Sequence, residues 1–578
     1  MLTVLVNWAL IAITSYSVGF IVLKALLRLM KVDDESFKKI SPMVNVVRVF
    51  LGLATLTAYA EIWSLFSNVG VFALYAVVIV SLIIVYLFRK EIGREVQIKP
   101  GIGLLIGLAV ILLMSYGTSR GYMHYDTNLY HAQAIRWIEQ YGIVPGLANL
   151  QSRFGYNSAE FALNALYSLV WYVGQSLHCT AGFFALMSVA VLAGIKEIWS
   201  HKDDNGKRII KIHLSDYVRL GLLFYLGIIY SEMISPASDY YAQLLIFDIV
   251  ILWLDMLDVD SKDEDIASAY KGILCILLVY AITIKLSIGL LVLLALIPGI
   301  YWIRKKNVKS IVTCIISGLI ISVPYFVRNY IISGWILYPS TLIKIGSPDW
   351  QIPKGEAQYD AREIGMWGRG ITSADQWKDV NATNWIADWF ASMPVIEKMW
   401  VLGSAVAVIV IIALLIYSLV RYIRHKSQED MDERLLVAGV IAVGTIFWFC
   451  SAPLVRYGYA YLIIMPLYLI GSLIVCKLPE KNRQIGNVIF IVMALSVTVL
   501  KAKGLAADIL RTKDADYYRI QQDYIDGEAS SYELEGVTIY VAEDAGQIGY
   551  YKFPSTVDVK EDIELRSDSI EQGFRKKK

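Results

Sequence analysis

A polar stretch between hydrophobic segments, residues 124–131, carries the side chains best suited to acid–base chemistry. Asp126 stands in it at the predicted rim of a membrane, where a charge is costly and is seldom kept without a role. We therefore predict that Asp126 acts as a general base. Four residues are predicted to orient this carboxylate, tune its pKa or contact an acceptor substrate: His124, Tyr130, His131 and the more distant Asp239.

Asp126 has a second explanation, because Asp is a common N-cap residue. A helix is predicted to follow it, to run as far as Tyr141 and to stop at Gly142. Apolar side chains occur on two of its faces, which predicts a helix that lies in the membrane interface rather than crossing it. No metal site is predicted, because Asp126 and His131 would point to different helix faces.

Basic side chains at the ends of apolar segments form a complementary group. We predict that four of them bind a phosphate or pyrophosphate at headgroup depth: Arg153, Lys285, Arg328 and Arg456. Each could instead extend its charge toward lipid headgroups. The surroundings of Lys285 are apolar, and Arg456 follows a proline that interrupts a helix, so these two favour binding most strongly.

A long loop, residues 334–397, contains six of the fifteen tryptophans together with five aspartates. Tryptophan is common at membrane interfaces, and this explains about half of the six. The others suit a lid over a site or stacking on sugar rings. For stacking we predict Trp350, Trp367 and Trp385.

The composition indicates a polytopic membrane protein. Of the 578 residues 57% are hydrophobic and 18% are charged, and long uncharged apolar segments recur along the chain. A net charge of +2 does not favour a nucleic-acid partner. The five cysteines are widely spaced and include no CxxC pair, which indicates packing residues rather than disulfides or metal ligands.

The sequence predicts an all-α fold of about fourteen transmembrane helices. The segments long enough to cross a bilayer are residues 4–28, 44–66, 69–88, 101–117, 180–198, 214–233, 239–257, 271–286, 287–303, 310–331, 398–422, 435–451, 457–477 and 486–503. With the amino terminus outside, every basic loop falls on one side, which the positive-inside rule makes cytoplasmic. These loops are residues 24–39, 89–99, 196–211, 304–309, 421–434 and 477–483.

This topology divides the chain into a transmembrane domain, residues 1–503, and a small extracytoplasmic tail, residues 504–578. In the tail, residues 537–541 are predicted to form a strand and residues 575–578 to be disordered. Residues 118–178 become a large outer loop. Within it, residues 159–172 are predicted to form an interfacial or re-entrant helix with a capping box at its start.

One consequence of the topology concerns charge. Asp126, Asp239 and the four predicted phosphate-binding cations all emerge on the outer face. Charges that a membrane protein merely tolerates would be scattered over both sides. Their concentration on one side predicts a single site that combines a carboxylate base with a phosphate clamp.

In this outer-loop motif the chain resembles the GT-C superfamily of integral membrane glycosyltransferases, which carry an acidic motif in the first large outer loop. It resembles more closely a group of bacterial membrane proteins placed near that superfamily. The motifs that carry this resemblance are YDTNLYH at 125–131, VPGLANL at 144–150, RFGYNS at 153–158, and Arg328-Asn329-Tyr330 through Ser333-Gly334 to Tyr338-Pro339.

The resemblance implies a GT-C-like bundle in the bacterial cytoplasmic membrane, with its active site on the extracytoplasmic face. Such enzymes move a sugar from a polyprenyl phosphate or diphosphate to a glycan, lipid or protein acceptor. Asp126 would be the base, and the clamp would be Lys285, Arg328 and Arg456. Many members pair two acids, whereas Thr127 follows Asp126 here. A second acid would come from Asp239 or Glu232, which leaves a divalent cation possible but not required.

Two other functions stay open. A polysaccharide polymerase or ligase would also use outer-face arginines but would take a whole lipid-linked glycan as its donor. A lipid or glycan transporter is less favoured, because the sequence shows no internal repeat and its ionisable groups are biased to one face. The absence of a P-loop or GxGxxG motif disfavours a nucleotide-driven pump.

Overall fold

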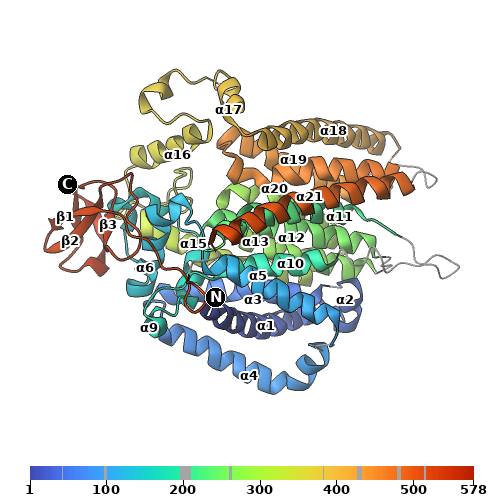
Figure 1. Cartoon of the computed structure of the whole chain (residues 1–578), viewed down its shortest axis with the longest axis horizontal. Coiled ribbons are helices and arrows are strands. Elements are labelled where there is room, and N and C mark those ends of the chain that lie inside the picture. The colour runs from blue at the N-terminus through green and yellow to red at the C-terminus, as the bar shows by residue number, and fades with distance from the viewer. Residues whose placement is uncertain are drawn as a thin grey trace.

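The computed structural model describes the chain except for residues 42, 97–99, 195–209, 260–262, 382, 426–431, 478–482, 513–515 and 578. Within these described residues, twelve helical segments are long and apolar enough to cross a membrane. They are α1 (Leu2–Met30), α3 (Val44–Ser64), α4 (Val71–Glu95), α5 (Ile102–Ser119), α12 (Ser238–Asp258), α13 (Glu264–Ile284), Leu286–Arg304, α15 (Val308–Ser333), α18 (Val395–His425), α19 (Glu433–Ser451), α20 (Val455–Ser472) and α21 (Arg483–Thr512) (Figure 1). The segment Leu286–Arg304 joins a 3-10 helix, Leu286–Ala295, to α14 (Leu296–Arg304).

The polytopic helical architecture is confirmed, and the count of about fourteen spans stays a prediction, because residues 195–198 of one predicted span lie outside the described part of the chain. The predicted segments 180–198 and 214–233 correspond to α10 (Thr180–Leu192) and α11 (Leu214–Ile229), which are 13 and 16 residues long. Both are shorter than the roughly 20 residues that a helix needs to span a bilayer. Most of the predicted basic loop 196–211, and parts of 89–99, 421–434 and 477–483, lie outside the described residues.

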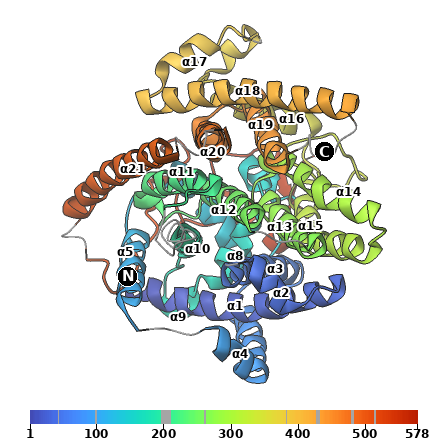
Figure 2. The same ribbon diagram turned by 90° about the vertical axis from the view of Figure 1, so that its right-hand side faces the viewer.

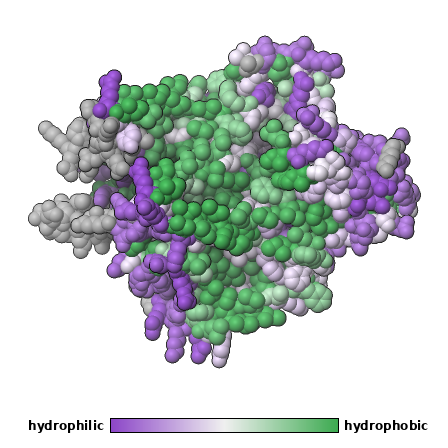
Figure 3. Space-filling view, turned by 180° about the vertical axis from the view of Figure 1, so that it is seen from behind, coloured by the Kyte–Doolittle hydropathy of each residue, from purple (hydrophilic) through white to green (hydrophobic). Residues whose placement is uncertain are grey.

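On the face that Figure 3 shows, a broad apolar band covers the bundle between two hydrophilic ends. The helices α4, α18 and α21 lie at the edge of the bundle and α12 near its middle (Figure 2). Only about a fifth or less of the most apolar part of each edge helix is buried within the protein. Their side chains therefore form a surface suited to lipid.

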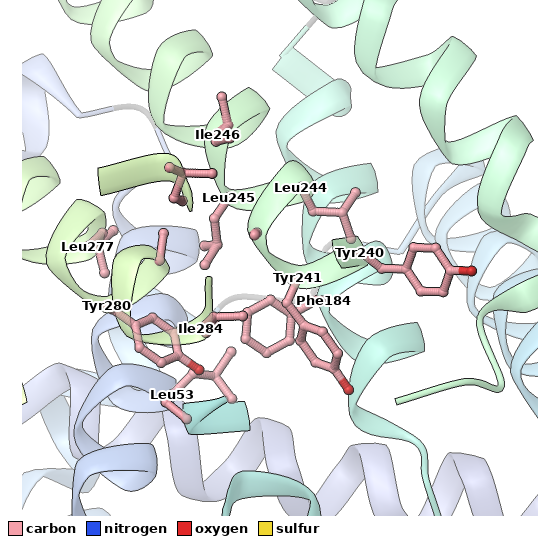
Figure 4. Packing of buried hydrophobic residues seen from close by; sticks show 14 of the residues in the cluster. Leu53, Phe184, Tyr240, Tyr241, Leu244, Leu245, Ile246, Leu277, Tyr280 and Ile284 are labelled. Carbon is pink, nitrogen blue, oxygen red and sulfur yellow. The ribbon is translucent and has the colours of Figure 1, made fainter. Parts of the chain in front are cut away.

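The central helix α12 fixes the geometry of the site, because Asp239 stands in its first turn. Its side chains are buried on all sides, as expected for a helix that is apolar around its whole circumference. Figure 4 shows Tyr241 and Leu245 of α12 among side chains of α3, α10 and α13. The rings of Tyr241 and Phe184 pack edge to face with their centroids 5.0 Å apart. This packing leaves α12 little freedom to shift.

The predicted outer loop contains short helices: α6 (Ala132–Tyr141), α7 (Leu147–Leu150), α8 (Ala159–Tyr167) and α9 (Val170–Val173). The predicted end of α6 at Gly142 is confirmed, and this glycine has a φ of 74°, which favours glycine. Seven of the ten residues of α6 are buried in the protein, and its place in the membrane interface stays a prediction. Protein packing covers both of its apolar faces.

The capping box predicted at the start of α8 is wrong. The Ser158 hydroxyl donates to the Ile284 carbonyl at 2.8 Å instead of capping its own helix. Glu160 turns inward and accepts a hydrogen bond from Asn164. A tertiary contact between the loop and the end of α13 thus replaces the local motif.

The tail forms two small sheets beside α6 (Figure 1). The first has the order β1 (Ala529–Leu534), β2 (Val537–Ala542), β3 (Ser555–Thr556), and the second pairs β4 (Ile563–Leu565) with β5 (Phe574–Lys576). The strand predicted at 537–541 is confirmed as β2. The disorder predicted for residues 575–578 is wrong for Arg575 and Lys576, which pair in β5; residue 578 lies outside the described part of the chain.

The tail holds the segment that carries Asp126. A π-helical turn spans Thr127–His131, in which the Ala132 amide donates to the Thr127 carbonyl five residues earlier. The Asn128 carbonyl accepts instead from the amides of Ile548 and Gly549, at 3.1 and 3.0 Å. The Tyr125 hydroxyl also donates to the Ala545 carbonyl at 3.0 Å. Tail contacts therefore lie on both sides of Asp126.

The buried side chain of Gln133 gives a test of this docking. Its amide donates to the carbonyls of Gly549, Tyr550 and Lys552 at 3.1, 3.3 and 3.1 Å. We expect Gln133→Ala to weaken tail docking by about 1–3 kcal/mol, because buried carbonyls lose their donor. Hydrogen exchange of residues 545–552 should accelerate, whereas exchange in Gln358→Ala, an exposed glutamine of α16 (Lys354–Gly368), should not. Equal protection in both variants would contradict this role.

Candidate functional site

Asp126 and Arg456 form an ion pair at the end of the bundle that carries the tail. Arg456 Nη2 donates to Asp126 Oδ2 at 2.7 Å. Asp126 makes no helix-capping hydrogen bond, so its carboxylate serves a tertiary contact and the N-cap explanation is wrong. Both side chains keep some exposure, 19% for Asp126 and 32% for Arg456, so the pair is open to a ligand.

His124 lies against the same guanidinium. Arg456 Nη1 is 2.8 Å from His124 Nε2, and the Asp126 amide is 3.1 Å from His124 Nδ1. A neutral imidazole accepts a hydrogen bond through only one nitrogen. Burial lowers the pKa of His124 to about 4, so the ring is neutral at pH 7 and cannot satisfy both donors.

Arg456 therefore has donor capacity to spare. Its Nη1 competes with a backbone amide for one imidazole, and its Nε is buried with no hydrogen-bond partner within the described part of the chain. Buried donors without acceptors are costly and rare in proteins. An anion placed beside Arg456 would supply the missing acceptors.

Asp239 and Lys285 complete the cluster. Lys285 Nζ forms an ion pair with Asp239 Oδ1, and Arg456 Nε lies 3.7 Å from Asp239 Oδ2. The Lys285 ammonium also stands 4.1 Å from the centre of the Tyr457 ring, a cation–π contact. The cluster thus contains two carboxylates and two cations, in formal balance.

Local sequence explains how these side chains reach one another. The span that begins with α13 ends at Ile284, and Lys285 has an extended backbone before the 3-10 helix begins. Such a break is tolerated at membrane depth only where protein or water covers it. Pro453 precedes α20, which places Arg456 in the first turn of that helix. Asp239 is likewise in the first turn of α12, where a helix dipole favours negative charge.

The electrostatics keep Asp126 ionised. Burial alone raises the pKa of its carboxyl, but the charge of Arg456, with smaller contributions from His124 and other neighbours, outweighs burial. The net pKa of Asp126 lies below its ordinary value. The carboxylate is therefore a proton acceptor at neutral pH, although a weak one while Arg456 holds it.

Tyr130 and His131 lie behind Asp126 on the π-helical turn. The His131 ring stacks 6.2 Å from His124 and packs 4.3 Å from the Tyr130 ring. Burial lowers the pKa of His131 to about 3, so this ring is neutral as well. The two side chains therefore support the cluster through packing, and His131 lies near enough to Asp126 to influence its pKa.

Arg456 also lines a cavity of about 270 Å³. Its walls come from α16, α17 (Ile386–Ser392), α18 and α20. Its lining includes Trp367, Trp389, Glu397, Arg456 and Tyr459. Arg456 thus connects the carboxylate cluster to a space large enough for a small substrate group.

The remaining predicted residues lie apart from the cluster. Arg328 is buried and donates to Ser64 Oγ and to Asn157 Oδ1, so it has no surface for a lipid phosphate. Arg153 pairs with Glu363 of α16 at 3.8 Å. Glu232, the alternative second acid, accepts a hydrogen bond from Tyr240.

The three tryptophans predicted to stack on sugars lie in three different surroundings. Trp367 lines the cavity. Trp350 lies 4.6 Å from the Arg566 guanidinium of the tail, and Trp385 is buried with its ring 5.5 Å from that of Trp389. Of the three, only Trp367 is placed where a substrate beside Arg456 could reach it.

Sequence reasoning missed Tyr457, Tyr459 and Glu397. Glu397 Oε1 accepts from the Tyr459 hydroxyl at 2.9 Å inside the cavity. The signal for the two tyrosines was their place beside Arg456 in Arg456-Tyr457-Gly458-Tyr459. Glu397 gave none, because it resembles any charged residue at the start of a span. Among the described residues, no group of three or more His, Cys, Asp or Glu side chains could hold a metal ion.

Comparison with known proteins gives one match. A family model described as a domain of unknown function (DUF8201) matches residues 1–463. The matched range includes Asp126, Asp239, Lys285 and Arg456, whereas α21 and the tail lie beyond it. No curated protein and no solved structure matches the chain.

The balance of charge in the cluster can be tested through Asp239. Its side chain is only 7% exposed, so Asp239→Ala would leave the Lys285 ammonium buried without its carboxylate. We expect this change to cost about 3–5 kcal/mol, seen as a lower thermal unfolding midpoint in detergent. The double variant Asp239→Ala/Lys285→Met should recover most of the loss. A single variant as stable as the wild type would contradict the ion pair.

Proposed function

The chain belongs to the DUF8201 family, and we propose that it is a membrane glycosyltransferase that uses a polyprenyl phosphate or diphosphate sugar as its donor. The observation that carries this proposal is the position of Arg456. Its guanidinium pairs with the carboxylate of Asp126, lines a cavity, and keeps a buried Nε without a hydrogen bond within the described residues. A phosphate-binding cation beside an ionised carboxylate suits transfer from a lipid-linked sugar.

The proposed reaction joins an acceptor hydroxyl to the sugar. Asp126 takes the proton of that hydroxyl as its oxygen attacks the anomeric carbon. The bond from this carbon to the phosphate oxygen breaks, and its electron pair leaves with the lipid phosphate. Arg456 and Lys285 stabilise the negative charge that develops on the phosphate. The lipid-linked sugar supplies the energy, so the reaction needs no nucleotide.

The proposed location is the extracytoplasmic face of a bacterial cytoplasmic membrane. The amino terminus supports it, because the Leu2 amide donates to the Tyr518 carbonyl and so lies at the tail end of the bundle. The predicted topology puts that end opposite the basic loops, which the positive-inside rule assigns to the cytoplasm. Polyprenyl-linked sugars would then be used outside the cell, in the assembly of surface glycans.

Analysis of lipid-linked intermediates tests the proposal. Cells that lack the gene should accumulate a lipid that carries one sugar, detectable by mass spectrometry of the extracted lipids. Accumulation of a lipid that carries an oligosaccharide would favour the polymerase or ligase instead. Unchanged lipid intermediates on both sides of the membrane would argue against both enzymes, and an intermediate trapped on the cytoplasmic side would indicate a transporter.

The role of Asp126 predicts the effect of an isosteric change. Asp126→Asn keeps the shape and a hydrogen-bond acceptor for Arg456 but removes the proton acceptor. We expect sugar transfer by the purified protein to fall about 10²–10⁴-fold, the usual contribution of a general base. Binding of the donor should persist. Transfer at the wild-type rate would show that Asp126 is not the base.

Arg456 predicts a change in pH dependence. The base works when ionised, so activity is lost as the pH falls through the pKa of Asp126, which Arg456 holds low. Arg456→Gln removes that charge and raises the pKa of Asp126. The acid limb of kcat/KM for the residual activity should therefore move to higher pH. An acid limb at the same pH as in the wild type would show that Arg456 does not lower the pKa of Asp126.

A further inference from the structure

We propose that the cavity beside Arg456 holds the sugar ring of the donor and selects an uncharged sugar, with Trp367 as its stacking surface and Glu397 as its hydroxyl acceptor. This inference rests on the proposed function, because the sugar in the cavity is the one that the proposed reaction transfers. It also goes further, since it names a chemical class: neutral hexoses and N-acetylhexosamines rather than uronic acids.

The cavity wall carries side chains of both charges. Arg456 and Tyr459 are three residues apart in α20 and so share one face of the helix. Arg456 brings a positive charge to the cavity wall, whereas Tyr459 holds Glu397, a carboxylate, at 2.9 Å. A ligand that contacts both side chains carries an anionic group for Arg456 and hydrogen-bond donors for Glu397. A sugar attached to a phosphate has this arrangement.

Glu397 is suited to hydroxyl recognition. Its Oε1 accepts from Tyr459, and the structure gives no hydrogen bond to its Oε2 within the described residues. The side chain is half-buried and lines the same cavity as Arg456. Charged acceptors bind hydroxyl donors strongly and repel a second carboxylate. The same side chain would therefore favour a neutral sugar and disfavour a uronic acid.

Trp367 supplies the apolar surface that a sugar ring needs. It is 44% exposed, whereas Trp389, which also lines the cavity, is buried and donates its Nε1 proton to the Pro453 carbonyl. Trp389 is thus part of the wall, and Trp367 presents accessible aromatic surface. An aromatic face with a few placed polar groups is typical of sites that bind polar organic ligands.

The helix that carries Trp367 is fixed in place. The neighbouring Gly368 lies so close to residue 452 that an added Cβ would come within 2.8 Å of the Ala452 backbone. Arg369 donates to the carbonyls of Cys450 and Ser451 at 2.8 and 3.1 Å, at the end of α19. Near the middle of α16, Asp360 accepts from the hydroxyls of Ser152 and Tyr338, at 3.1 and 3.0 Å. The stacking surface is therefore preorganised.

Binding of soluble sugar phosphates to the detergent-solubilised full chain tests the inference. The probes are glucose 1-phosphate, N-acetylglucosamine 1-phosphate, galactose 1-phosphate and glucuronic acid 1-phosphate, with inorganic phosphate as the reference, in calorimetric titrations. At least one neutral sugar phosphate should bind about ten-fold or more tightly than inorganic phosphate. Glucuronic acid 1-phosphate should bind more weakly than glucose 1-phosphate.

Two variants locate the binding. Glu397→Gln should weaken the binding of neutral sugar phosphates about ten-fold, since a charged hydrogen bond becomes neutral. The difference in affinity between glucose 1-phosphate and glucuronic acid 1-phosphate should become smaller. Trp367→Ala should weaken the binding of every sugar phosphate and leave the affinity for inorganic phosphate unchanged. Trp171→Ala, which removes a partly exposed tryptophan of α9, is the matched control and should change none of them. Unfolding midpoints of all variants report whether the fold is kept.

The outcomes separate this inference from the proposed function. Sugar phosphates that bind no better than inorganic phosphate, or binding that Glu397→Gln leaves unchanged, would overturn the inference even if Asp126→Asn abolishes transfer. Sugar phosphates that bind through Glu397 and Trp367 in a protein whose loss leaves lipid-linked intermediates unchanged would support the sugar site and overturn the transferase. A preference for glucuronic acid 1-phosphate would overturn the predicted selectivity.

Discussion

The contact between Arg456 and Asp126 is the interaction on which the other features of the site depend. One guanidinium lies against a carboxylate, an imidazole and a second carboxylate, and it also lines the cavity. At the end of a membrane bundle such charges are stable only if they balance. Asp239 and Lys285 provide that balance, so α12, α13, α20 and the Asp126 segment must meet at one place.

The fold meets this constraint with rigid helices and one long-range clamp. The packing around α12 fixes Asp239, and breaks in the helical backbone at Lys285 and before α20 bring the two cations to it. The Asp126 segment has no such support of its own, because it lies in a loop. The tail supplies this support, because two of its backbone amides donate hydrogen bonds to the Asn128 carbonyl. That carbonyl belongs to the π-helical turn. Residues more than 400 positions later in the chain thus position Asp126.

The sequence allowed the residues of the cluster to be predicted, but not which side chain each of them contacts. Asp126, Asp239, Lys285 and Arg456 interrupt or border apolar segments, and alternation of the spans puts them at one end of the bundle. The same argument included Arg328, although its side chain turns into the protein toward Ser64 and Asn157. Hydropathy reports the depth of a residue but not the direction of its side chain. For the same reason Trp367 could not be separated from Trp385, nor the tail contacts foreseen.

The pairing of Asp126 with Arg456 also couples the two halves of the proposed mechanism. A donor phosphate can bind Arg456 fully only by competing with the carboxylate that already holds it. As the guanidinium turns to the phosphate, Asp126 loses the charge that lowers its pKa, and its basicity rises. The base then becomes effective when the donor is present and stays weak when it is absent. An empty site would therefore hold little driving force to deprotonate water or a stray hydroxyl, so the ion pair that stabilises the resting fold also restrains its chemistry.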